Sequence, residues 1–321
     1  MWLFVLFCGV ILLTVLISYG CYRFAFYAAP KRNRPDIEVP QGAAYAVFHE
    51  DMINWIKEAR RMTHEDVAIT SFDGLKLCGK FYEYAPGAPI ELMFHGYRGT
   101  AERDLSGGVQ RCFKLGRSAL IVDQRCSGGS EGHVITFGIK EHRDCLSWID
   151  FMLEHFGSDV KIILTGISMG AATVMMAAGH ELPANVIGVL ADCGYNSARD
   201  IIYKVMRQIG LPPSVCYPFV KLGARLFGQF DPDAYSPEEA MRNCKVPVIF
   251  FHGTQDDYVP WEMSRVNFDA CASRKKLVLI PDAAHGLSYP VAPDTYLSEL
   301  KDFFGPEASC EKQPDGDIFT A

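Results

Sequence analysis

The chain lacks three features that would each define a class of protein. Its 321 residues carry a net charge of −7, so there is no basic footprint for nucleic-acid binding. No Cys-x-x-Cys or Cys/His metal-ligand spacing occurs, and no internal repeat. The eleven cysteines are an odd number without a paired framework, and several lie inside apolar runs (Cys145, Cys193 and Cys244). This pattern favours buried, reduced thiols and a cytosolic environment.

Charge is also absent from Met1 to Tyr22, an apolar stretch long enough to cross a bilayer as a helix. A cleaved secretory signal is the competing interpretation, but no basic residue precedes the stretch and no Ala-x-Ala site follows it. A lipoprotein site at Cys21 fits less well, because Ser18-Tyr19-Gly20 departs from the usual lipobox. Basic residues flank the stretch on its C-terminal side (Arg23, Lys31, Arg32 and Arg34). By the positive-inside rule, we expect a single-pass anchor with the rest of the chain in the cytoplasm.

What the chain does have is a series of apolar runs that each end in a polar loop. Two strands joined by a hairpin at Asp73-Gly74 are followed by runs without polar alternation, which indicates strands buried on both faces. The predicted strands are 67–72, 77–84, 90–94, 119–122, 162–164, 186–191, 246–251 and 277–280. With helices between them, such as 140–154 and 261–272, they predict a doubly wound, mostly parallel α/β sheet of about eight strands.

The remaining segments divide the chain. We expect a transmembrane anchor at 1–22, a linker with a leading helix at 23–63, a catalytic domain at 64–305 and a disordered tail at 306–321. A stretch at about 199–235 is longer than one crossover needs. Its two helical segments, 201–209 and 215–227, predict a small cap over the strand ends that forms part of a pocket.

The most informative motif is Gly166-Ile167-Ser168-Met169-Gly170. It follows the apolar run at 162–164 and precedes a helix-forming run, which is the strand–turn–helix context of a nucleophile elbow. A serine hydroxyl needs a base within reach and a carboxylate that orients the base. Ligands of such sheets bind beyond the carboxyl ends of the strands.

Candidate partners of Ser168 follow later strands. His285 lies among small residues after the last strand, whereas His95 and His252 each precede a glycine in a tight turn and are expected to brace loops. Asp256 and Asp257 both follow one strand, and we favour Asp256 as the acid. Two backbone N–H groups, those of Tyr97 and Met169, are the expected oxyanion donors.

With these motifs the chain resembles serine hydrolases of the α/β-hydrolase superfamily, over roughly Val67 to Phe304. The pattern is most similar to dienelactone-hydrolase-like and BEM46-like esterases and to the hydrolase domain of prolyl-oligopeptidase-type enzymes. The motifs that carry it are His95-Gly96-Tyr97, Asp123-Gln124-Arg125, the elbow, His252-Gly253 with Asp256, and Ala284-His285-Gly286. The resemblance implies Ser168 as nucleophile, Asp256 as acid, His285 as base, and no cofactor. Cys126 departs from the small residue usual in the Asp-x-Arg loop.

We therefore expect a serine hydrolase that cleaves a carboxylic ester through an acyl-Ser168 intermediate. Cleavage of amides, peptides or thioesters and acyl transfer by the same triad are alternatives that the sequence leaves open. A membrane-tethered binding protein that has lost turnover is a third. The anchor and the apolar cap favour a small, lipid-derived ester or acyl substrate, and no nucleic-acid partner.

Overall fold

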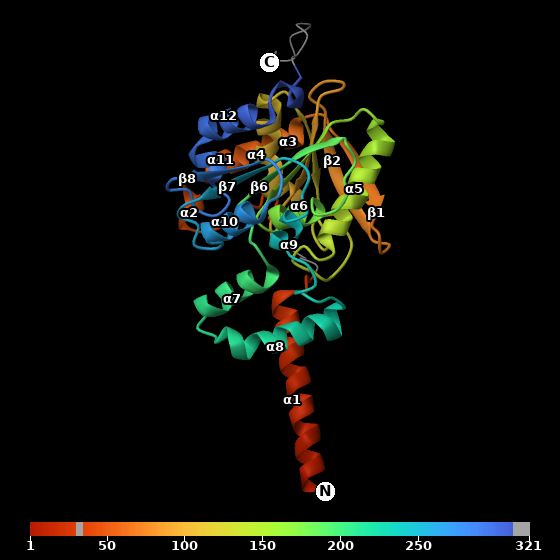
Figure 1. The fold of residues 1–321 in the computed structure, drawn as a ribbon, viewed down its shortest axis with the longest axis vertical. Coiled ribbons are helices and arrows are strands. Elements are labelled where there is room, and N and C mark those ends of the chain that lie inside the picture. Colours follow the sequence, from red (N-terminus) through yellow and green to blue (C-terminus); the bar gives the residue numbers. More distant parts are fainter. Residues whose placement is uncertain (30–34, 311–321) are drawn as a thin grey trace.

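An eight-stranded sheet forms the centre of the computed structural model, which describes residues 1–29 and 35–310 (Figure 1). The strand order is β1-β2-β4-β3-β5-β6-β7-β8. Strands β3 to β8 pair in parallel, and β2 is antiparallel to β1 and β4 at one edge. The bounds are β1 Glu65–Thr70, β2 Lys76–Tyr82, β3 Ile90–Phe94, β4 Ser118–Val122, β5 Ile162–Ile167, β6 Val186–Asp192, β7 Val248–Gly253 and β8 Lys275–Ile280. The predicted α/β fold class and its mostly parallel sheet are confirmed.

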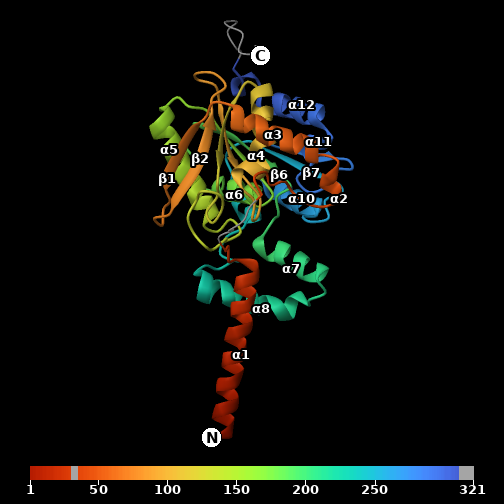
Figure 2. The ribbon, with the colours of Figure 1, turned by 180° about the vertical axis from the view of Figure 1, so that it is seen from behind.

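Helices cover both faces of this sheet (Figure 2). Successive residues of a strand point to opposite faces, so Leu92 packs with Trp148 of one layer while Met93 packs with Leu105 of the other. The first layer holds α5 Glu141–Phe156, α6 Met169–Ala177, α9 Pro237–Met241 and α10 Trp261–Ala270. The second holds α3 His49–Arg61, α4 Ala101–Lys114, α11 Ser288–Val291 and α12 Pro293–Phe304. Burial on both faces explains why the strands are continuous apolar runs.

An apolar helix, α1 (Trp2–Ala25), projects from the end of the molecule where the strands have their carboxyl ends (Figure 1). It is long and apolar enough to cross a membrane, and its N-terminal half is exposed. The predicted anchor ended at residue 22. The helix continues to Ala25, and at this end Tyr22 and the adjoining Phe26 are buried in the protein.

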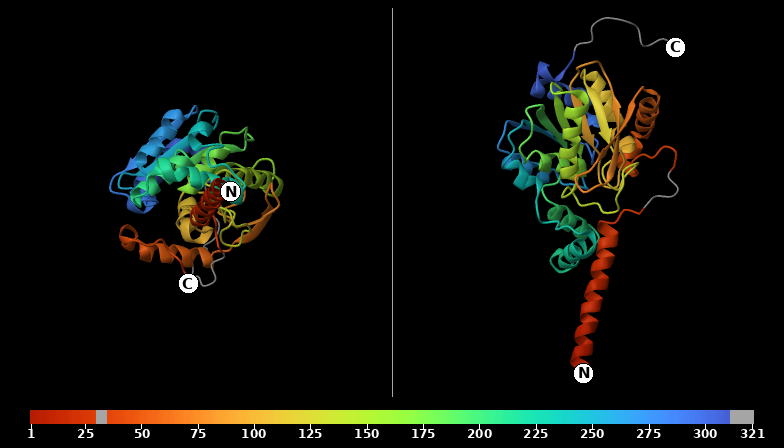
Figure 3. Two further views of the ribbon diagram at one scale, coloured as in Figure 1. Left: turned by 90° about the horizontal axis from the view of Figure 1, so that it is seen from below. Right: turned by 90° about the vertical axis from the view of Figure 1, so that its right-hand side faces the viewer.

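The predicted helix pair is present as α7 (Ala198–Gln208) and α8 (Pro213–Gly223), followed by the π-helical turn η1 (Ala224–Gly228). We call residues 198–228 the cap. Figures 1 and 3 show the cap beside the upper part of α1, between the sheet and the free end of that helix. Its buried side chains, among them Met206, Tyr217 and Val220, form one apolar cluster with Tyr22 and Phe26.

The segment after the anchor is more than a linker. Residues 35–63, which we call the N-terminal arm, include α2 (Ala43–Ala46) and α3, and α3 packs along α4. At the other terminus, the turn η2 (Pro306–Ala308) corrects the expectation of a disordered tail from residue 306. The Arg117 Nε–H donates to the Ala308 carbonyl at 2.6 Å and Cys310 N–H donates to Gly116 O at 2.9 Å, which holds this segment on the domain. The rest of the predicted tail, residues 311–321, lies outside the described residues.

Candidate active site

Ser168 lies on a sharp turn between β5 and α6, with φ of 57° and ψ of −117°. Such backbone angles are strained for a residue with a side chain. The flanking glycines are required by space: a Cβ on Gly166 would lie 2.1 Å from the Gly170 carbonyl oxygen, and one on Gly170 would lie 2.0 Å from Phe94 O. The turn therefore presents the Ser168 hydroxyl at the carboxyl edge of the sheet, at the start of α6.

The structure brings the three predicted side chains together. His285 Nε2 lies 2.9 Å from Ser168 Oγ, and His285 Nδ1 lies 2.7 Å from Asp256 Oδ2. Burial raises the pKa of Asp256, but hydrogen bonds from His252 and His285 outweigh it and hold this pKa well below its usual range. An ionised carboxylate can only accept, so His285 Nδ1 carries the proton and Nε2 is left to accept from the serine hydroxyl.

The loop after β7 holds the Asp256 carboxylate in place. Asp256 Oδ1 accepts the backbone N–H groups of Tyr258 at 2.9 Å and Val259 at 2.7 Å. His252 Nε2 faces Asp256 Oδ2 at 3.2 Å and Val259 O at 2.8 Å, so it donates to two acceptors. His252 therefore braces the acid loop, as its place before a glycine indicated. The neighbouring Asp257 has an exposed side chain and lines the cavity without approaching the imidazole as Asp256 does.

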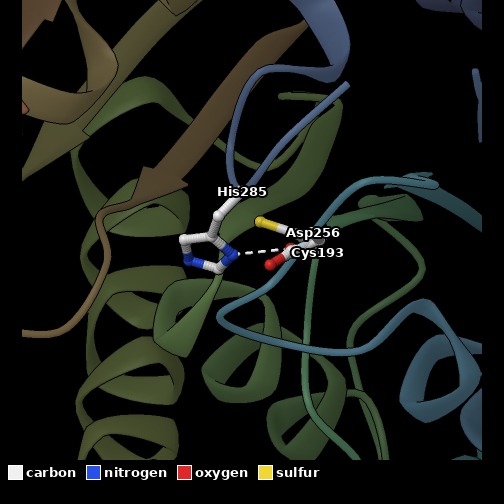
Figure 4. Close-up of side chains that lie close together, drawn as sticks. All are labelled: Cys193, Asp256 and His285. Atoms are coloured by element: carbon white, nitrogen blue, oxygen red, sulfur yellow. Dashed lines mark hydrogen bonds and ion pairs between the residues drawn. The ribbon is translucent and has the colours of Figure 1, made fainter. Parts of the chain in front are cut away.

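A buried thiol completes the surroundings of the acid. Figure 4 shows Cys193 beside Asp256 and His285, and one ligand atom of each lies within 4.8 Å of the others. Burial raises the pKa of Cys193 well above its usual value, so the sulfur is a neutral thiol. His285 Nδ1 and Asp256 Oδ2 are already each other's hydrogen-bond partners at 2.7 Å, and a metal ligand from Cys193 would have to be a thiolate. The cluster therefore fits a hydrogen-bonded acid–base pair better than a metal centre.

The loop after β3 passes directly beside the nucleophile. A Cβ on Gly96 would lie 3.5 Å from Ser168 Cβ. The loop is held by Asp104 Oδ2, which accepts the Gly96 N–H at 3.1 Å, and by the Gly99 N–H, which donates to Gly96 O at 3.1 Å. This arrangement keeps the backbone of Tyr97 next to the elbow, where the Met169 N–H begins α6.

Polar side chains from two of the motifs named in the sequence analysis support loops rather than line the reaction centre. They are those of His95, Gln124 and Arg125. His95 Nε2 accepts the Gln124 N–H at 3.0 Å, and Gln124 Nε2–H donates to the His95 carbonyl at 2.6 Å. Arg125 donates to both oxygens of Asp144 at 2.6 Å. Cys126 has a φ of +69°, and burial raises the pKa of its thiol to about 12, which supports a filling role over a reactive one.

Ser168 opens into a cavity of about 480 Å³, a size suited to a small molecule. The N-terminal arm contributes one wall through Tyr45, Met52 and Trp55, and Tyr258 and His285 line the cavity as well. The Tyr45 hydroxyl also donates to the backbone carbonyl of His285 at 2.9 Å. The sequence reasoning treated this segment as a connector and missed these residues. For Met52 the signal was the apolar spacing of the leading helix, which showed an amphipathic helix but not its partner, whereas Tyr45 lies before that helix.

Residues 199–235 are not among those that line this cavity, so the expectation that the cap forms part of the pocket wall is wrong for it. The apolar side chains of the cap pack instead on α1. The cap contacts the loop that carries the acid. Lys204 Nζ and Gln208 Nε2 both donate to the Asp257 carbonyl, and the distance from Gln208 Nε2 is 3.0 Å.

A buried ionic cluster lies at the inner end of the cavity. Glu91 of β3 is fully buried and pairs with Arg111 and with Arg117, whose Nη1 is 2.8 Å from Glu91 Oε1. Burial raises the pKa of Glu91, but the two guanidinium groups outweigh it and lower this pKa. Asp192, at the end of β6, accepts hydrogen bonds from Ser288 at 2.8 Å and Tyr296 at 2.9 Å. Three residues of this region, Arg111, Asp192 and Tyr296, line the cavity.

Comparison with solved structures identifies the fold. The fold of this chain is similar to that of solved α/β-hydrolases, among them a Pyrococcus furiosus esterase, Pf2001 (TM-score 0.62, 20% identity, 84% of this chain and 98% of that one). The mouse α/β hydrolase domain-containing protein 10 is also similar (TM-score 0.55, 20% identity, 74% and 97%). The chain therefore has the α/β-hydrolase fold.

Sequence comparison adds curated relatives to which the chain is similar. The chain is 26% identical to the protein bem46 of Schizosaccharomyces pombe over 220 residues, which are 67% of each protein. It is 25% identical to YqkD of Bacillus subtilis over 190 residues, 59% of this chain and 62% of that relative. No protein-family model matches the chain. The resemblance to BEM46-like proteins expected from the motifs is confirmed.

Proposed function

We propose that this chain is a serine hydrolase that cleaves a carboxylic ester through an acyl-Ser168 intermediate. The observation that carries the proposal is the unbroken series of hydrogen bonds from Ser168 Oγ to His285 at 2.9 Å and from His285 to Asp256 at 2.7 Å. A serine, an imidazole and a buried carboxylate in this order are what acyl transfer requires. The esterase named among the structures of similar fold supports the same reaction class.

In the proposed reaction, His285 Nε2 takes the Ser168 proton as Oγ bonds to the acyl carbon. The N–H groups of Tyr97 and Met169 stabilise the oxyanion that forms, a contribution of about 3 kcal/mol for each donor. The C–O bond to the alcohol then breaks, and the imidazolium gives its proton to the leaving oxygen. Water attacks the acyl-Ser168 carbon with the imidazole as base, which releases the acid and restores the serine. Ionised Asp256 stabilises the imidazolium in both halves.

A substrate drawn from a membrane suits the position of the site. The Tyr97 hydroxyl donates to the Ala25 carbonyl at 2.7 Å, and Arg98 donates to the Phe24 carbonyl at 2.7 Å, so the oxyanion loop contacts the end of α1. We propose that α1 spans a bilayer, with its basic flank and the catalytic domain in the cytoplasm. The substrate would then be a small ester or acyl compound of lipid origin.

Thioester cleavage is the second candidate, because the chain is 30% identical to the thiohydrolase aneE of Aspergillus aculeatus over 159 residues, 48% of this chain. The same three side chains would act on a thiolate leaving group. Rates on matched oxygen esters, thioesters and aminoacyl amides of one acyl group would separate the candidates. A preference for the thioester of tenfold or more would favour the second.

The decisive test compares two adjacent acids. We expect Ser168→Ala to lower kcat on p-nitrophenyl esters about a thousandfold or more, and Asp256→Asn about a hundredfold or more. Asp257→Asn is the matched control and should stay within about threefold of the parent, because its side chain is exposed and the carboxylate bonded to His285 is that of Asp256. Full activity of Ser168→Ala would refute the proposed mechanism.

A further inference from the structure

One face of the cap carries large apolar side chains that nothing in the described chain covers. Ile209, Leu211, Val215 and Leu226 are 55%, 44%, 60% and 52% exposed. A surface patch of this kind marks an interaction site. The question is which partner it meets.

Helix α8 has two apolar faces, which a helix that only packs on its own domain does not need. Tyr217 and Val220 are buried against α1 and the rest of the cap cluster. Val215, Phe219 and Leu222 recur at spacings of four and three and form a second face, exposed or half-exposed. Leu226, in the turn η1, adds to the exposed apolar surface.

The apolar face of this segment suits a lipid surface. From Gln208 to Phe230 there is no acidic residue, and the two basic residues, Lys221 and Arg225, form ion pairs with Asp231 and Asp233 next to the segment. An amphipathic helix with a free apolar face is typical of segments that lie in the headgroup region of a bilayer, and here the apolar area and not the charge supports this placement. Figure 1 shows α8 crossing α1, so α8 would run along a membrane that α1 crosses.

The length of α1 sets the depth of the cap. The whole helix has 24 residues and is about 36 Å long. The cap contacts it at Ser18 and Tyr22, where a Cβ on Gly223 would lie 2.2 Å from Ser18 O and 3.2 Å from Tyr22 Cβ. From Trp2 to Leu13 every residue of the helix is exposed, and this part measures about 18 Å, shorter than the hydrocarbon core of about 30 Å. A bilayer spanned by α1 therefore reaches the level of α8.

We propose that the exposed face of the cap lies within the proximal leaflet of the bilayer, so that the protein is held by α1 and by α8 together. Tyr19 and Tyr22, at the same level, are residue types enriched at the membrane interface, and both rings contact Phe227 of η1, with centroids 5.1 and 5.8 Å apart. The inference rests on α1 spanning a membrane and not on the reaction at Ser168.

The test uses the full chain in phosphatidylcholine vesicles, with the photoreactive residue p-benzoylphenylalanine placed at one position at a time. We expect phospholipid adducts, identified by mass, at Val215 and Leu226. Leu12, 61% exposed in α1, is the positive control and should also form adducts. Val47, which follows the last residue of α2 and is 80% exposed, is the matched negative control and should form none.

Three outcomes would overturn the inference. Adducts at Leu12 but at neither cap position would leave α1 in the bilayer and place the cap outside it. No adducts at Leu12 either would refute the spanning of α1 and with it the depth of the cap. Cross-links from Leu226 to a second copy of the chain in place of lipid would identify a protein interface and contradict the proposal.

Discussion

The N-terminal arm and the cap are two helical additions to the same sheet, yet they have different partners. The arm packs its apolar face on α4, lines the cavity beside Ser168 and leaves one large apolar side chain, Val47, mostly exposed. The cap packs on α1, does not line that cavity and leaves four such side chains exposed. An amphipathic pattern therefore identifies a helix that needs a partner, and the partner decides whether the helix serves a pocket or a membrane.

The largest expected effect is a difference in the free energy of unfolding. Truncation of a buried side chain in the arm should cost far more than truncation of an exposed side chain of the same size in the cap. Ile56 of the arm is 1% exposed and Leu226 of the cap is 52% exposed. Ile56→Ala should lower the free energy of unfolding by about 3 kcal/mol, because it leaves a cavity. Leu226→Ala should change it by no more than about 0.5 kcal/mol in detergent micelles. Chemical denaturation of both variants measures this difference, and equal losses would show that Leu226 is buried in the molecule.

A glycine on α8 tests the contact between the cap and α1. Gly223→Val places a side chain against Ser18 O and Tyr22, and overpacking of this kind costs about 1–3 kcal/mol. We expect limited proteolysis to cut the cap faster, with the cuts mapped by mass spectrometry. Gly20→Val is the control, because nothing lies within 4 Å of its Cβ position. Equal protection of both variants would contradict the packing described.

The pH dependence of stability tests Asp256, whose neighbours His285 and Asp257 accept hydrogen bonds from the arm and from the cap. The folded-state pKa of Asp256 is lowered, so its contribution to stability is present above the ordinary aspartate pKa of about 4 and is lost as the pH falls toward the folded value. We expect the parent protein to lose more stability than Asp256→Asn when the pH drops from 5 to 2. Measured unfolding free energies that fall in parallel would contradict the pKa shift.

The smallest expected effect is a change in kcat. It follows from removal of the hydrogen bond that each region makes near the site. Tyr45→Phe removes the hydrogen bond from the arm to the His285 carbonyl and should lower kcat on a soluble short-chain ester a few-fold. Gln208→Ala removes a contact from the cap to the Asp257 carbonyl and should leave kcat within about twofold. A larger loss in Gln208→Ala would assign the cap a role in the reaction centre.

Much of the sheet and the elbow could be predicted because their signals are local. Apolar runs bounded by polar loops marked the strands, and Gly166 and Gly170 are required by atoms in the elbow itself and in the adjacent strand. The order of Ser168, Asp256 and His285 along the chain predicted the group that the structure brings together.

The partners of the two helical regions could not be predicted, because they depend on contacts between distant residues. The arm lies against α4 since Gly107 leaves room for the Trp55 ring, which a Cβ there would approach to 2.6 Å. The cap meets α1 where Gly223 lets the backbone of Ser18 approach. Nothing in the local pattern of residues 40–60 or 198–228 indicates these glycine contacts.

The most direct measurement is labelling of the folded, full-length protein with a fluorophosphonate probe, followed by mass-spectrometric mapping of the modified residue. The account predicts that the probe modifies the Ser168 side chain, and that His285→Ala lowers the labelling rate at least a hundredfold because the hydroxyl loses its base. Absence of labelling in the folded protein, or modification of a different serine with Ser168 untouched, would contradict the proposed nucleophile.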